Sequence, residues 1–170
     1  HSDAKAFVKG CPVCQLADAT RMKGAPSQEN LESKSLFEVM AMDLLALPES
    51  EEGYSYILVI MEYLTSYVWT VPLKTKRAEE VAEAFAMHVL IPFGWPKVLL
   101  TDNGTEFKNR VVDELLRLGG TQRRFTTAYN PQADGRVERF NSTLIGMLRK
   151  CAFLCPSSWP LFLPTIAQGW

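Results

Sequence analysis

The chain has 170 residues, of which 47% are hydrophobic and 22% are charged, and its formal net charge is −1. This composition supports one domain with a hydrophobic core and a short extension, and it excludes a uniformly basic nucleic-acid-binding protein. No apolar run approaches the roughly 18 residues of a membrane span and no signal peptide is recognisable, so we expect an intracellular protein with reduced cysteines.

The predicted elements begin after a polar stretch, residues 1–30, which ends in a segment of linker composition. From residue 31 onward the hydrophobic pattern favours strands and helices in the order β-β-β-α-β-α-β-loop-α-α. The strands are expected within 36–48, 54–63, 67–73, 95–101 and 121–127; the helices within 78–90, 108–120 and 137–151, with a last one starting at Ser157 or Ser158; and a loop at 128–136. This order favours a mixed sheet with helices on both faces.

The charge is unevenly distributed along these elements. Residues 121–150 contain six basic and two acidic side chains, a net charge of +4, so the rest of the chain carries −5. A basic patch on a near-neutral domain predicts contact with phosphates on one face only.

Three acidic residues are candidates for a metal site. Asp43 lies inside the first apolar strand, and Asp102 follows the strand "VLLT" and precedes an Asn-Gly turn. If these strands are adjacent, both carboxylates meet at one sheet edge and repel each other unless a hard divalent cation binds between them. Glu138 opens the next helix and is the candidate third ligand, while Asn141 and Arg149 follow on the same helix face and are placed to contact a polar substrate.

Each of these residues also has a simpler interpretation. Asp102 before Asn-Gly is an ordinary turn residue, Asp43 is a strand residue bound to a backbone amide, and Glu138 is a solvated helix residue. Cys11 and Cys14 have C-x₂-C spacing, which is half of a zinc site.

Three stretches together resemble a known family: "MDLLALP", "LLTDNGTEF" and "TTAYNPQADGRVERFNSTL". Thirty-five residues separate Asp102 from Glu138, the spacing of the Asp-Asp-Glu triad in the integrase catalytic core of retroviruses and gypsy-type LTR retrotransposons, which this chain resembles. The resemblance implies an α/β, RNase H-like fold, a mixed five-stranded sheet flanked by helices, over residues 31–170. The stretch "CPVCQ" at 11–15 resembles the end of the zinc-binding domain that precedes such cores, so residues 1–30 would be its tail and a linker.

The resemblance also implies a chemistry. Asp43, Asp102 and Glu138 would hold two Mg²⁺ (or Mn²⁺) ions for processing of a DNA 3′ end and strand transfer, and Cys11 and Cys14 would bind zinc in a longer protein. The loop "YNPQADG" would be mobile, with Gly135 as its flexible point. The expected DNA contacts are Tyr129, Gln132, Gly135, Arg136, Arg139, Asn141 and Arg149.

The implied partners are double-stranded DNA of the element end and of the target, in a homodimer or higher assembly without a membrane. The implied location is the nucleus or a virus-like particle. Two alternatives stay open from the residues alone: a non-catalytic DNA- or protein-binding module derived from an integrase, and a plain RNase H-type nuclease.

Overall fold

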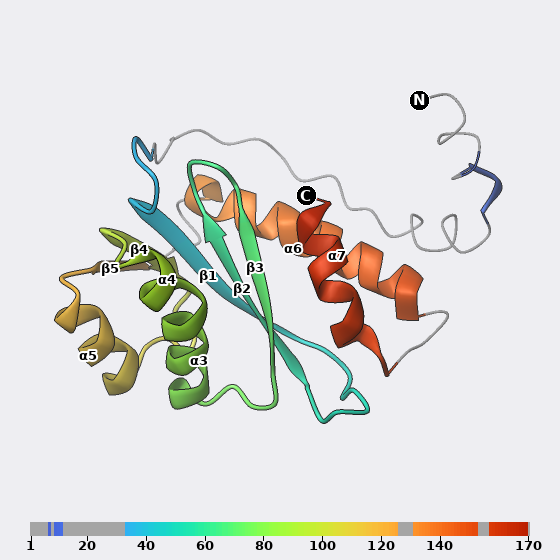
Figure 1. The fold of residues 1–170 in the computed structure, drawn as a ribbon, viewed down its shortest axis with the longest axis horizontal. Helices are drawn as coiled ribbons and strands as arrows, with labels where there is room; N and C mark the ends of the chain where they lie inside the picture. Colours follow the sequence, from blue (N-terminus) through green and yellow to red (C-terminus); the bar gives the residue numbers. More distant parts are fainter. Residues whose placement is uncertain (1–6, 8, 12–32, 126–130, 153–156, 170) are drawn as a thin grey trace.

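The computed structural model describes residues 7, 9–11, 33–125, 131–152 and 157–169, and within helix α6 it describes side chains from residue 136 to residue 151 (Figure 1). Most of the predicted extension at 1–30 therefore lies outside the described residues, and the proposed domain boundary stays a prediction. None of the described helices is long and apolar enough to cross a membrane.

A five-stranded mixed sheet forms the centre of the fold, with strand order β3-β2-β1-β4-β5. The first three strands form an antiparallel meander, and β4 and β5 continue the sheet in parallel with β1. Their bounds are β1 (Val39–Ala46), β2 (Tyr56–Glu62), β3 (Val68–Leu73), β4 (Val98–Thr101) and β5 (Gln122–Phe125). All five strands were predicted, and the central ones are apolar except for Asp43 in β1 and Glu62 at the end of β2, because both faces of the sheet are covered.

Helices pack on the two faces and enclose two hydrophobic cores (Figure 1). Side chains of β1 alternate between them: Val39 and Ala41 face one core, and Met40 and Met42 face the other. The first core is closed by α6 and α7, and the second by α3 and α5. The helical elements are α3 (Ala78–Phe85), the π-helical turn η1 (Ala86–Leu90), α4 (Ile91–Phe93), α5 (Arg110–Leu118), α6 (Pro131–Ala152), the 3₁₀ turn η2 (Trp159–Phe162) and α7 (Leu163–Gln168).

One prediction about the elements is wrong. Residues 131–136, expected in a mobile loop with Gly135 as its flexible point, form the first turns of α6, which begins at Pro131. Proline is well tolerated there because the first turn of a helix has no intrahelical partner for its backbone N–H groups. The turn-forming residues of "NPQADG" favour a loop, but a proline also marks the start of many helices.

The end of α5 depends on the absence of a side chain at Gly119. A Cβ built there would lie 1.9 Å from two ring carbons of Trp95. We expect Gly119→Ala to displace the indole and to lower the free energy of unfolding by about 1–3 kcal/mol. Urea unfolding with Gly146→Ala as control tests this, because a Cβ at Gly146 in α6 meets nothing within 4 Å and alanine favours the helix by about 0.5–1 kcal/mol. Equal effects of the two substitutions would contradict the prediction.

Glu62, at the end of β2, is a buried carboxylate with an exposed fraction of 1%. Its two oxygens accept hydrogen bonds from the backbone N–H of Leu64 (3.1 Å), the backbone N–H of Thr65 (2.7 Å) and the Thr65 hydroxyl (2.6 Å). Burial raises the pKa of Glu62, but these bonds together lower it by more, so its pKa lies below the usual 4.5. The turn between β2 and β3 therefore holds an ionised carboxylate inside the fold.

This arrangement predicts an acid-sensitive fold. Because the pKa of Glu62 is lower in the folded than in the unfolded chain, its contribution to stability is complete above about pH 4.5 and is lost as the pH falls below that value. Glu38 acts with the same sign, since the backbone N–H of Lys34 and the Lys97 ammonium lower its pKa to about 2. Urea unfolding between pH 3 and pH 6 is expected to show stability falling toward acid, with a shallower fall in Glu62→Gln. An unchanged slope in that variant would show that Glu62 is not responsible.

Candidate active site

The parallel pairing of β1 and β4 places Asp43 and Asp102 at the same level of the sheet. Ala41 of β1 pairs with Leu100 of β4. Asp43 and Asp102 each follow two residues later, so they occupy equivalent positions, Asp102 just past the end of its strand. Ala41 and Leu100 both face the core under α6. By the alternation of side chains, the same face receives both carboxylates.

Helix α6 brings the third candidate to this edge. Its apolar stripe of Val137, Phe140, Leu144 and Leu148 is buried against the sheet. Asn141 lies within that contact with an exposed fraction of 6%, and its Nδ2 donates a hydrogen bond to Oδ2 of Asp43. Glu138 precedes Asn141 by three residues, nearly one helical turn, and is exposed. The contact between Asn141 and Asp43 therefore brings the part of α6 that carries Glu138 close to Asp43.

One polar atom of the Asn141 side chain is left without a hydrogen bond among the described residues. This atom is Oδ1, which is buried, and an unpartnered buried acceptor is costly. Asp43 is half-buried, and its other oxygen, Oδ1, accepts the backbone N–H of Leu44 at 2.8 Å. The sequence assigned Asn141 to DNA contact alone, whereas in the structure it also orients Asp43.

Asp102 is exposed and begins a compact turn. Its Oδ1 accepts the backbone N–H of Gly104 at 2.8 Å, which is the turn role of the simpler interpretation. A Cβ on Gly104 would lie 2.9 Å from that oxygen and 2.8 Å from Cδ of Glu106. A side chain at 104 would therefore have to displace the Asp102 and Glu106 carboxylates, and Glu106 is half-buried in this turn.

The expected DNA contacts other than Asn141 fall into three groups. Arg136, Arg139 and Arg149 are exposed on α6, and Arg136 donates from Nη1 to the Tyr63 carbonyl, with its guanidinium 5.5 Å from the centre of the Tyr63 ring. Gln132 and Gly135 lie in the first turns of α6, where side chains are not described. Tyr129 lies outside the described residues, as does Cys14, while Cys11 is half-buried.

The strand register aligns Asp43 with Asp102, but the three candidate carboxylates do not form one cluster in the described part of the chain. In the part of the chain that the structure describes, no group of three or more histidine, cysteine, aspartate and glutamate side chains is close enough to hold a metal ion. Like-charged carboxylates repel each other, and Asp102 uses one oxygen in its own turn. The donor set is nevertheless all oxygen, which suits Mg²⁺ or Mn²⁺.

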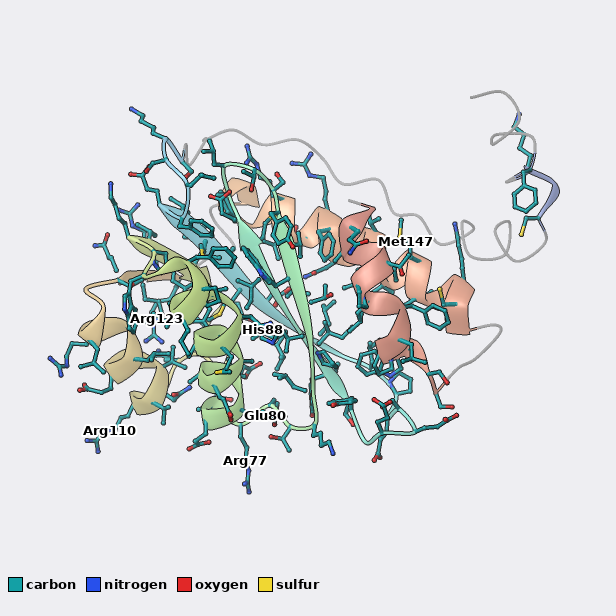
Figure 2. The ribbon with its side chains drawn as sticks, in the orientation of Figure 1. Arg77, Glu80, His88, Arg110, Arg123 and Met147 are labelled. Atoms are coloured by element: carbon teal, nitrogen blue, oxygen red, sulfur yellow. The ribbon has the colours of Figure 1, made fainter. Side chains whose placement is uncertain are left out.

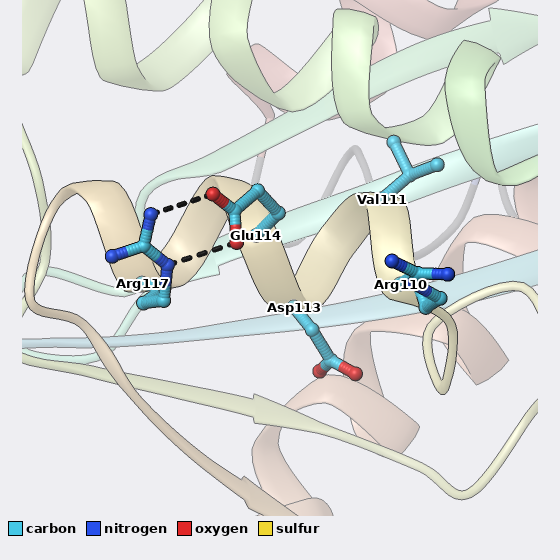
Figure 3. Close-up of a pocket in the computed structure, with 5 residues that line it drawn as sticks. All are labelled: Arg110, Val111, Asp113, Glu114 and Arg117. Atoms are coloured by element: carbon cyan, nitrogen blue, oxygen red, sulfur yellow. Dashed lines mark hydrogen bonds and ion pairs between the residues drawn. The ribbon is translucent and has the colours of Figure 1, made fainter.

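A surface hollow of about 410 Å³ lies elsewhere, on α5 (Figure 3). It is lined by Arg110, Val111, Asp113, Glu114 and Arg117, and Arg117 forms a two-bond ion pair with Glu114 along the helix. Arg117 and Glu114 are both exposed, so this pair adds little to stability. None of the predicted site residues lines this hollow.

Comparison with known proteins identifies the family. Residues 35–131, more than half of the chain, match the model of the integrase core domain. The chain belongs to the integrase core domain family. It is 27% identical over 166 residues to the Pro-Pol polyprotein of simian foamy virus type 3 (strain LK3), and 29% identical over 167 residues to the transposon Tf2-3 polyprotein of Schizosaccharomyces pombe (strain 972 / ATCC 24843). These matches cover 98% and 96% of this chain but only 14% and 12% of the two polyproteins.

Solved structures confirm the fold expected for an integrase core. The dimeric form of the HTLV-2 integrase catalytic core domain in complex with magnesium has a TM-score of 0.64 at 18% identity, over 80% of this chain and 87% of that one. The simian T-cell lymphotropic virus intasome in complex with PP2A regulatory subunit B56 gamma has a TM-score of 0.70 at 17% identity, over 98% of this chain and 59% of that one. The mixed five-stranded sheet flanked by helices is therefore an RNase H-like fold, as the sequence motifs implied.

Proposed function

We propose that this chain is the catalytic core of a metal-dependent polynucleotidyl transferase that processes a DNA 3′ end and joins it to target DNA. The observation that supports this most strongly is the register of the sheet. It sets Asp43 and Asp102 at one level of adjacent parallel strands, beside the helix that carries Glu138. Membership of the integrase core domain family favours the same reaction class over a plain RNase H-type nuclease.

Asp43, Asp102 and Glu138 are the residues that would hold two Mg²⁺ or Mn²⁺ ions. The all-oxygen donor set and the spare buried Oδ1 of Asn141 next to Asp43 fit such a polar, cation-binding edge. Bound divalent ions would stabilise charge on the attacking and leaving oxygens of an in-line phosphoryl displacement. In this proposal Asp43 would be a ligand of both ions, Asp102 would hold one of them and Glu138 the other.

Side-chain and backbone groups of the chain itself orient the Asp43 carboxylate. The Asn141 amide fixes one oxygen of Asp43, and the Leu44 N–H fixes the other. The exposed Arg139, one residue after Glu138, is placed to meet a phosphate of the DNA strand. The nucleophile would be water in 3′-end processing and the DNA 3′-hydroxyl in strand transfer, so no covalent protein intermediate is needed.

The proposed partners are double-stranded DNA and further copies of the chain. Solved structures of similar fold are described as dimeric, as trimeric and as an intasome. Acting on chromosomal DNA, the protein would work in the nucleus of a eukaryotic host.

The proposal can be tested by the reversal of strand transfer, because this reaction depends least on domains outside the catalytic core. A branched DNA, in which an element end is already joined to a target, is incubated with the protein and Mn²⁺, with Asp102→Asn in parallel. We expect cleavage and rejoining by the wild type and none by the variant. Inactivity of the wild type, together with no change in its melting temperature on adding Mn²⁺, would refute the proposal and favour a non-catalytic DNA-binding module.

A further inference from the structure

Arg123 of β5 is a largely buried cation between the sheet and α5, with 13% of its side chain exposed (Figure 2). It pairs with Leu99 of β4 in the sheet and therefore faces the core under α5, away from α6. Its Nη2 forms an ion pair with Oδ1 of Asp113 on α5, and its Nη1 donates a hydrogen bond to the backbone carbonyl of Phe107. Its guanidinium also lies 4.7 Å from the centre of the Phe125 ring.

The Phe107 carbonyl belongs to the segment 102–109, which links β4 to α5 and begins with Asp102. Phe107 is fully buried, and its backbone N–H donates to the Gly104 carbonyl at 3.1 Å. Gly104 in turn donates its N–H to Oδ1 of Asp102 at 2.8 Å. A short series of contacts thus connects Arg123, through Phe107 and Gly104, to the Asp102 carboxylate.

The contacts at residue 123 explain why it is an arginine and not a lysine. Burying a guanidinium is costly unless its charge and its N–H groups are satisfied. A lysine would keep the charge, but its single ammonium group cannot bond Phe107 and Asp113 in the planar, two-sided manner of a guanidinium while stacking on Phe125. Arg123 thus joins three parts of the fold, the 102–109 segment, α5 and β5, at one point.

We propose that Arg123 is a positioning residue that fixes the segment 102–109 and, through it, the carboxylate of Asp102. The catalytic relevance of this inference rests on the proposed function, but the positioning itself is a property of the folded chain. Arg123 contacts no substrate in this account. It acts from the opposite face of the sheet to the three carboxylates.

Amide hydrogen exchange of the metal-free protein tests the positioning directly. In Arg123→Gln we expect the amides of Gly104, Phe107 and Lys108 to exchange at least tenfold faster, while amides of β2 keep their protection. Arg123→Lys is expected to fall between the wild type and Arg123→Gln. Arg117→Gln is the control, because this variant also loses an ion pair on α5, but one that joins Arg117 to Glu114 within the helix and not to the segment. Unchanged exchange in the segment, or an equal acceleration of all amides, would overturn the inference.

Metal dependence in the branched-DNA assay tests the consequence for the site. If the wild type is active, Arg123→Gln is expected to need at least tenfold more Mn²⁺ for half-maximal rate, at a temperature where both proteins are folded, and Arg117→Gln is expected to match the wild type. An equal Mn²⁺ requirement would overturn the catalytic part of the inference. If the wild type is inactive, the proposed function fails, and hydrogen exchange alone then decides whether Arg123 positions the segment.

Discussion

Substitution of Glu138 by glutamine is expected to reduce DNA strand transfer by about a thousandfold or more while leaving the fold intact. The change removes one negative charge from the site and replaces a carboxylate oxygen, a strong ligand for a hard cation, with an amide. Glu138 is exposed on α6, so the free energy of unfolding should change by no more than about 0.5 kcal/mol. The branched-DNA assay with Mn²⁺, combined with urea unfolding, measures both quantities.

The matched control is Glu83→Gln, an exposed glutamate on α3, on the opposite face of the sheet. It should retain wild-type activity, which would separate loss of the Glu138 carboxylate from a general loss of negative charge. Activity of Glu138→Gln close to that of the wild type would remove Glu138 from the proposed triad. Asp43 and Asp102 would then be the remaining ligands of the proposed metal site.

Substitution of Asn141 by alanine is expected to lower activity by about 10- to 100-fold, the usual effect of removing a group that orients a metal ligand. The variant removes the hydrogen bond that Asn141 on α6 donates to Oδ2 of Asp43. Because Asn141 is buried, we also expect a loss of about 1–2 kcal/mol in the free energy of unfolding. The Mn²⁺ requirement should rise, since a less constrained Asp43 holds a cation less well.

Thr143→Ala is the comparison for Asn141→Ala. The Thr143 hydroxyl donates its hydrogen bond to the Arg139 carbonyl within the same helix, at 3.0 Å, and not to Asp43. If the two variants lose stability but only Asn141→Ala raises the Mn²⁺ requirement, the orienting role is established. An unchanged Mn²⁺ requirement in Asn141→Ala would reduce Asn141 to a packing residue.

The sequence predicted the features that depend on periodic patterns and on the position of a residue within its element. The five strands follow from apolar runs of strand length, and Asp43 and Asp102 could be placed on one sheet edge because each follows a buried strand segment. Long-range contacts could not be predicted in this way. Neither the bond from Asn141 to Asp43, across 98 residues, nor the burial of Arg123 has a local signal. In "QRRF" both arginines look alike, and only the pairing of β5 with β4 shows that the first of them faces α5.

The start of α6 within "NPQADG" could not be predicted for a different reason. Proline and glycine lower the expectation of a helix when each is considered alone, but a proline at the first position of a helix costs nothing. A glycine inside a helix costs only about 1 kcal/mol. The remaining 20 residues of α6 and its buried stripe outweigh that cost, so the helix extends to Pro131.

The length of α6 sets a scale for the proposed DNA substrate. The helix has 22 residues, and Arg149 follows Glu138 by eleven, a distance of about 16 Å at 1.5 Å per residue. Glu138 and Arg149 share a helix face, but at this distance they would contact different phosphates of the substrate. On duplex DNA, with about 3.4 Å between successive base pairs, that distance corresponds to about five base pairs. The single rigid helix would thus engage the strand at its reacting end and again half a double-helical turn away.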